Sequence, residues 1–174
     1  DAPGVLQLPT DRVRPSVLTY HGASVAFELG AEFGAQLRKF NQRAQVTQFM
    51  TLAAAFSVLL QRYSGQHDIC IGYPVANRHR AEIEGLIGFF VNTLVLRSRM
   101  QPQQSFAQLL SQVRESVLDG DAHQDLPFEK LVEELRPERS LAHAPLFQVM
   151  ISLNNTAQAQ LQLPGLTVQP VPRS

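Results

Sequence analysis

Apolar residues recur along this chain with two different spacings. Segments with a helical spacing, near every third or fourth position, cover 33–40, 47–63, 105–118 and 128–135. Segments that alternate or are continuously apolar, as strands are, cover 24–29, 69–75, 91–97, 147–154 and 166–171. Because helical and strand-like segments follow one another, the pattern predicts an α/β domain with helices layered on a sheet.

Capping residues predict where two of the helices begin and end. Thr47 is a suitable N-cap, and Gly65 follows the last apolar turn of the same helix. Ser105 and Gln108 form a capping box for the next long helix, and Gly120 marks its expected end. The first of these helices is apolar nearly all round, which predicts burial between layers. The short run 69–75 is typical of a central strand covered on both faces.

The segment His123-Gln124-Asp125 has two interpretations. An adjacent carboxylate can orient and charge a histidine, which would suit catalysis. Pro127 follows and is suited to the first turn of a helix, so Asp125 can equally cap that helix. The residues alone favour the helix entry.

Two more polar sites precede this segment. Asn77-Arg78-His79-Arg80 follows the central strand and offers cations to a phosphate, although a solvated loop paired with Glu82 and Glu84 is the favoured interpretation. Asn92 lies in phase with the apolar positions of the next strand. Its amide therefore needs hydrogen-bond partners. It can find them either in a neighbouring backbone segment, which it would pin, or in a cavity that it faces.

The segment 147–154 has one apolar and one mixed face. The mixed face suits either solvent or the wall of a cleft, and it consists of Gln148, Met150, Ser152 and Asn154.

Composition narrows the function classes. The 174 residues suffice for one domain with a core, and Lys+Arg and Asp+Glu both number 15, which argues against a nucleic-acid surface. We expect no membrane segment, no signal peptide, no metal site and a cytoplasmic location. The single cysteine, Cys70, stands in an apolar run and is expected to be a buried, unreactive thiol.

Three blocks in this chain resemble, in the same order, blocks from the second lobe of the condensation domains of non-ribosomal peptide synthetases. They are 87–97 (IGFFVNTLVLR), 123–129 (HQDLPFE) and 144–150 (APLFQVM). The segments 6–12 and 60–80 also resemble that family, so the likeness covers nearly the whole chain.

The resemblance implies a fold similar to one half of the chloramphenicol acetyltransferase-like pseudo-dimer, in which two lobes face each other across a tunnel. It implies amide-bond formation between donor and acceptor aminoacyl or peptidyl thioesters on carrier proteins, with phosphopantetheine arms as tethered substrates and no cofactor bound directly. The family's catalytic signature, His-His-x-x-x-Asp-Gly, is absent from this chain. We therefore expect no catalytic residue here and no activity of the chain alone.

The resemblance also implies boundaries and site residues. Residues 1–20 would be the linker between lobes, and 21–174 the C-terminal lobe, ending before its final strands and helices. The residues implied at the tunnel wall are Asn92, Gln124, Asp125, Gln148, Ser152 and Asn154. Asn77 and Arg78 would contact the phosphopantetheine arm.

The implied partners are the N-terminal lobe of the same domain and the two carrier proteins. An isolated lobe is expected to form a homodimer or to aggregate through its uncovered face. The alternatives are a non-catalytic, condensation-like docking domain and a related epimerisation or acyltransferase domain. The blocks containing Asn92 and His123 favour condensation over epimerisation.

Overall fold

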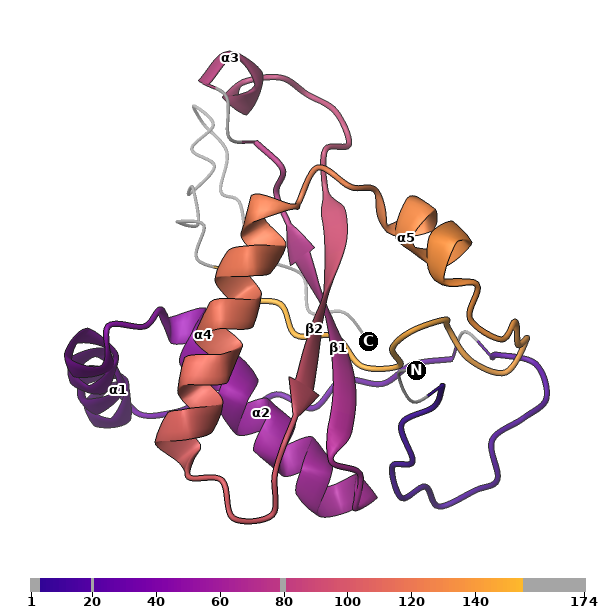
Figure 1. The fold of residues 1–174 in the computed structure, drawn as a ribbon, viewed down its shortest axis with the longest axis horizontal. Coiled ribbons are helices and arrows are strands. Elements are labelled where there is room, and N and C mark those ends of the chain that lie inside the picture. Colours follow the sequence, from indigo (N-terminus) through magenta and orange to yellow (C-terminus); the bar gives the residue numbers. More distant parts are fainter. Residues whose placement is uncertain (1–3, 20, 79–80, 155–174) are drawn as a thin grey trace, which may run out of the picture.

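The centre of the fold is an antiparallel pair of strands, β1 (Asp68–Val75) and β2 (Asn92–Arg99). The computed structural model describes residues 4–19, 21–78 and 81–154. Figure 1 shows the two strands next to each other, to the right of α4 in this view. On the other edge of β1, the Gly72 amide donates to the carbonyl of Val149 and the Ile151 amide donates to the carbonyl of Gly72, both at 3.0 Å. The strand predicted over 147–154 is thus reduced to one parallel bridge, between Gly72 and Met150, beside a sheet of two described strands.

Two long helices, α2 (Gln48–Ser64) and α4 (Phe106–Ala122), cover one face of this sheet (Figure 1). Each starts with the predicted capping box, at Thr47 and at Ser105, and α2 ends at Gly65 with a left-handed φ of 70°. The core between these helices and the sheet consists of Met50, Ala53, Ala54, Tyr73, Leu94, Leu96, Leu109, Leu110, Val113 and Val117. The layered α/β prediction is confirmed.

Three shorter helices complete the described part. α1 (Ala31–Ala44) contacts α2, and the Thr51 hydroxyl of α2 donates to Asn41 Oδ1 of α1 at 2.7 Å. α3 (Ala81–Glu84) lies between the strands in sequence, and α5 (Phe128–Leu135) follows α4. No single helix of the described residues is long and apolar enough to span a membrane; α1 and α2 meet that test only together, as a pair bent by 101°.

The opposite face of β1 is covered by aromatic rings. The ring of Phe147 lies directly over Gly72, where an added Cβ would come within 2.4 Å of it. Phe147 also packs on Phe128 of α5, with ring centroids 5.4 Å apart. On the same face Cys70 is half-buried, less than predicted, and burial raises the pKa of its thiol.

The N-terminal segment is partly built into the fold. Leu6 is buried with Leu60, Ile69 and Ile71, so the predicted linker 1–20 contributes to the core at this point.

Besides the strand at 147–154, three sequence predictions are wrong in detail. The segment 24–29 forms no strand, and Val25 and Phe27 are 89% and 83% exposed, because its alternation has no neighbouring strand to pair with among the described residues. The apolar helix α2 is buried on one side only, since Leu59 and Tyr63 are exposed. Helix α4 continues past Gly120 to Ala122.

Gly120 has a packing role, although its position near the end of the helix had predicted a role in helix termination. The hydroxyl of Tyr73 lies 2.7 Å from the point where a Cβ at Gly120 would sit. Close approach between β1 and α4 therefore explains this glycine, whereas helix termination does not. The predicted strand at 166–171 lies outside the described residues.

Candidate functional site

Asn92, at the first position of β2, binds four backbone groups. Its Nδ2 donates to the carbonyls of Gln124 and Leu126, both at 2.7 Å. Its Oδ1 accepts from the amides of Thr93 at 2.8 Å and Phe128 at 3.2 Å. Because most of these groups lie in the turn between α4 and α5, the side chain fixes that turn to the sheet. Of the two predicted roles of Asn92, pinning a neighbouring backbone is thus the one seen directly.

The Asn92 bond to Phe128 also replaces a cap. The N-cap position of α5 is Pro127, which provides no side-chain hydrogen bond, and Asp125 lies two residues before it. The first free amide of α5 is instead bound by Asn92 from another element. The capping role predicted for Asp125 is therefore filled by Asn92 at this amide.

A cavity of about 280 Å³ adjoins this turn and brings predicted residues together. Asn77, Asn92 and Asp125 all line it. The remaining lining comes from two blocks of the family resemblance and consists of Phe89, Phe90, Val91, Thr93, Pro127, Phe128 and Glu129. The two most specific sequence blocks thus meet around one hollow, which we call the Asn92 cavity.

Asn77 gives the Asn92 cavity an unused acceptor. It follows the end of β1 with a φ of 50°, a left-handed conformation that asparagine tolerates. Its Oδ1 is buried and accepts no hydrogen bond from any residue that the structure describes. Since a buried carbonyl oxygen without a donor costs free energy, this atom is suited to an N–H or O–H group of a bound molecule.

Arg78 organises the loop next to this cavity. Its guanidinium donates to the carbonyls of Ile83 at 2.5 Å, Leu86 at 2.8 Å and Gly88 at 3.3 Å. The same group lies 4.2 Å from the centre of the Phe90 ring, a cation–π contact. The side chain therefore holds in place the segment that carries the Phe90 wall. His79 and Arg80 lie outside the described residues.

Gln148 joins two distant parts of the chain. Its Oε1 accepts from the Leu6 amide at 2.7 Å, and its Nε2 donates to the carbonyls of Gly4 at 3.2 Å and Ala144 at 3.1 Å. The carboxamide is thus occupied by backbone groups, a use that the alternating pattern of the sequence could not reveal.

The remaining predicted residues lie away from the Asn92 cavity. The Gln124 side chain donates to the Asp121 carbonyl at 2.8 Å, while Ser152 and Asn154 are exposed. Among the described residues, Gln124, Gln148, Ser152 and Asn154 contribute nothing to the cavity lining.

His123 belongs to the end of α4 and contacts Asp119 of the same helix. It is the C-cap residue of α4, and its Nδ1 lies 2.8 Å from the carbonyl oxygen and 3.6 Å from a carboxylate oxygen of Asp119. The side chain is 75% exposed. These contacts of His123 fit the structural interpretation and involve Asp119 in place of Asp125.

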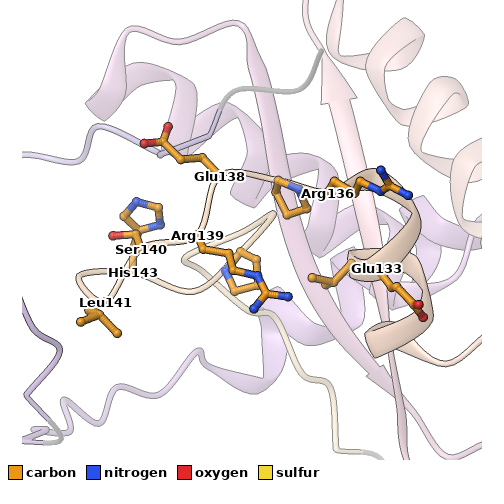
Figure 2. A pocket seen from close by; sticks show the side chains of 10 residues that line it. Glu133, Arg136, Glu138, Arg139, Ser140, Leu141 and His143 are labelled. Atoms are coloured by element: carbon orange, nitrogen blue, oxygen red, sulfur yellow. The ribbon is translucent and has the colours of Figure 1, made fainter.

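A larger cavity of about 690 Å³ lies in the loop after α5 (Figure 2). Its lining is mixed in charge, with Glu133, Arg136, Glu138, Arg139 and His143. In the view of Figure 2, Arg139 lies between the two glutamates. Because the charges are mixed and no predicted site residue lines it, this cavity does not indicate a ligand class. No group of three possible metal ligands occurs among the described residues either.

Sequence comparisons identify the family that these blocks resemble. Residues 2–173 match the family model described as the condensation domain. The chain is 56% identical over 151 residues to a linear gramicidin synthase of Brevibacillus parabrevis, and 51% identical over 158 residues to phosphinothricin tripeptide synthetase PhsC of Streptomyces viridochromogenes. These matches cover 87% and 91% of this chain but only 3% and 14% of the relatives.

Solved structures of related domains have the same fold. A four-domain nonribosomal peptide synthetase bound to AMP and glycine matches with a TM-score of 0.87 at 28% identity, over 90% of this chain and 12% of that one. The X-domain from teicoplanin biosynthesis matches with a TM-score of 0.78 at 30% identity, over 86% of this chain and 33% of that one. Because the family model spans nearly the whole sequence and the fold agrees, the chain belongs to the condensation domain family of nonribosomal peptide synthetases.

Proposed function

We propose that this chain is the C-terminal lobe of a condensation domain that forms an amide bond between aminoacyl or peptidyl thioesters on two carrier proteins. One observation carries the proposal: the blocks 87–97 and 123–129, which are separate in sequence, meet at the Asn92 cavity. The proposed partners are the N-terminal lobe, reached through residues 1–20, and the donor and acceptor carrier proteins.

In this proposal the lobe positions substrates and transfers no proton. Asn92 fixes the turn that carries Asp125 and Phe128, and Arg78 fixes the loop that carries Phe90. Asn77 Oδ1 is an open acceptor suited to an amide N–H of a phosphopantetheine arm. Holding two tethered substrates in line can contribute several kcal/mol to the lowering of a barrier, so a lobe without a catalytic base still contributes to rate.

The other predicted residues have supporting roles in this proposal. Gln124 binds the end of α4 and Gln148 binds the N-terminal segment. Together with the exposed Ser152 and Asn154, they remain predicted tunnel-wall residues outside the Asn92 cavity. Arg78 remains a predicted contact for the phosphate of the arm as well as the organiser of its loop.

A single-turnover assay with both carrier proteins loaded tests the proposal. The complete condensation domain should form product, and the 174-residue chain alone should not. Asn77→Ala in the complete domain should slow product formation several-fold, because it removes the open acceptor, whereas the exposed amide variant Gln103→Ala should leave the rate unchanged. Product from the isolated chain, or equal rates in the Asn77 and Gln103 variants, would contradict it.

A second candidate is a docking domain without catalysis. The likeness to the teicoplanin X-domain, which has also been solved in complex with OxyB, favours it. A complete domain that carries an intact His-His-x-x-x-Asp-Gly signature and forms product would exclude this candidate.

A further inference from the structure

A separate cavity of about 480 Å³ lies between the start of α2, the end of β1 and the last turns of α4. Its volume is within the range of about 300–1,000 Å³ that is typical of small-molecule sites. The wall is mainly apolar and includes Phe49, Met50, Val117, Leu118, Ile151 and Leu153. It shares no described lining residue with the Asn92 cavity.

Tyr73 places an unpaired hydroxyl in this wall. The residue is only 4% exposed, and its hydroxyl makes no hydrogen bond with any residue that the structure describes. The ring packs on Phe49 with centroids 5.1 Å apart, and the hydroxyl lies against Gly120, so the side chain is held in one position. Burial and the nearby Asp121 raise the pKa of Tyr73 to about 12, which keeps the hydroxyl protonated at neutral pH.

Asp121 provides a charge at the open side of the same cavity. It follows Gly120 on α4, is exposed to solvent, and its carboxylate has no ion-pair partner among the described residues. Partial burial of the carboxyl raises its pKa. None of the described lining residues is a lysine, arginine or histidine.

We propose that this cavity binds a small primary ammonium ligand with an aliphatic or aromatic body. The Asp121 carboxylate and the Tyr73 hydroxyl would accept hydrogen bonds from the ammonium group, and the apolar wall would cover the body. Charge-assisted hydrogen bonds of this kind are the stronger ones in proteins, and the cation would compensate the Asp121 charge. The inference is independent of the proposed condensation function, because it uses none of the residues assigned to that function.

Binding of n-hexylammonium to the 174-residue chain, measured by calorimetry or ligand-observed NMR, tests this site. Hexylammonium should bind at least tenfold more tightly than 1-hexanol or hexanoate at neutral pH. Asp121→Asn should weaken its binding about tenfold, because it removes the negative charge, and Tyr73→Phe about three- to fivefold, because it removes the hydroxyl acceptor. Both variants keep the size of the side chain, and melting curves verify that they fold.

Asp119→Asn is the matched control. It removes a carboxylate from the same helix, but the Asp119 side chain is 81% exposed and does not line the cavity. Unchanged affinity in this variant supports the site. Equal weakening by the Asp119 and Asp121 variants, equal binding of hexanol and hexylammonium, or no binding up to 10 mM (on the order of the weakest specific interactions) would each overturn the proposal.

Discussion

Replacing Asn92 by alanine removes a side chain that holds four backbone groups. An ordinary hydrogen bond contributes about 0.5–1.5 kcal/mol to stability, so four bonds sum to roughly 4 kcal/mol. The bond to the Leu126 carbonyl lies at an exposed position, where water can replace the amide. We therefore expect Asn92→Ala to lower the free energy of unfolding by about 2–3 kcal/mol.

Urea unfolding followed by circular dichroism measures this loss. The midpoint should fall with an unchanged slope, because the variant changes stability and not the surface exposed on unfolding. For a chain of this length, about 2–3 kcal/mol corresponds to a melting temperature lower by roughly 4–12 °C. Gln103→Ala, which removes an exposed amide without a hydrogen bond to the described residues, should stay within about 0.5 kcal/mol of the parent.

Asn92→Asp separates the donor from the acceptor part of the side chain. It retains an acceptor for the amides of Thr93 and Phe128, but it places a carboxylate oxygen against the carbonyls of Gln124 and Leu126. At neutral pH this variant should be at least as destabilised as Asn92→Ala. If Asn92→Ala leaves both the unfolding midpoint and the turnover of the complete domain unchanged, the assigned role is wrong. Lost turnover at full stability would instead place Asn92 in contact with substrate.

Three further predictions concern the sheet and the surface. Gly72→Ala should destabilise the chain by about 1–3 kcal/mol in urea unfolding, since the new Cβ would overlap the Phe147 ring, and Phe147→Leu should partly restore stability; additive losses would contradict the overlap. The hydrogen bond from Arg97 lowers the pKa of Asp68, so this carboxylate stabilises the fold fully above its ordinary pKa of 3.8 and loses that effect as the pH falls through the lowered value in the folded state. Asp68→Asn should flatten the acid limb of a plot of unfolding midpoint against pH, and an unchanged limb would argue against the pair. Exposed apolar residues such as Phe27 should cause concentration-dependent dimerisation, measured by light scattering; a monomer over a hundredfold concentration range would refute this.

Local signals explain why most of the helices were predictable. Thr47 and Ser105 lie within three residues of the amides that they cap, so sequence neighbours are enough to locate both helix starts. The strand prediction for 24–29 was wrong because an alternating segment forms a strand only where a partner strand is available. Gly120 was misassigned because the reason for it, Tyr73, is 47 positions away in the sequence.

The candidate site was predictable only where a local pattern in the sequence was enough. A polar amide in phase with apolar positions must find partners, which identified Asn92 without any structure. Its partners across the turn are 32–36 positions away, so the sequence could not choose between a backbone and a cavity role. Similarly, the alternating pattern around Gln148 did not predict that its carboxamide forms hydrogen bonds with the backbone of Gly4 and Leu6.

The bond between Leu6 and Gln148 has a consequence for how the chain folds during synthesis. It joins positions 142 residues apart, whereas β1, β2, α2 and α4 find one another within residues 48–122. Gln148 lies 26 residues after the end of α4 at Ala122, so at about 5–20 residues per second a ribosome needs roughly 1–5 s to make the chain between the two stages. Until then the edge of β1 that later receives Val149 and Ile151 is an unpaired strand edge, a template for wrong pairing. Folding of this chain therefore has an early helix–sheet stage and a late closing stage, and aggregation during translation should arise in the interval between them.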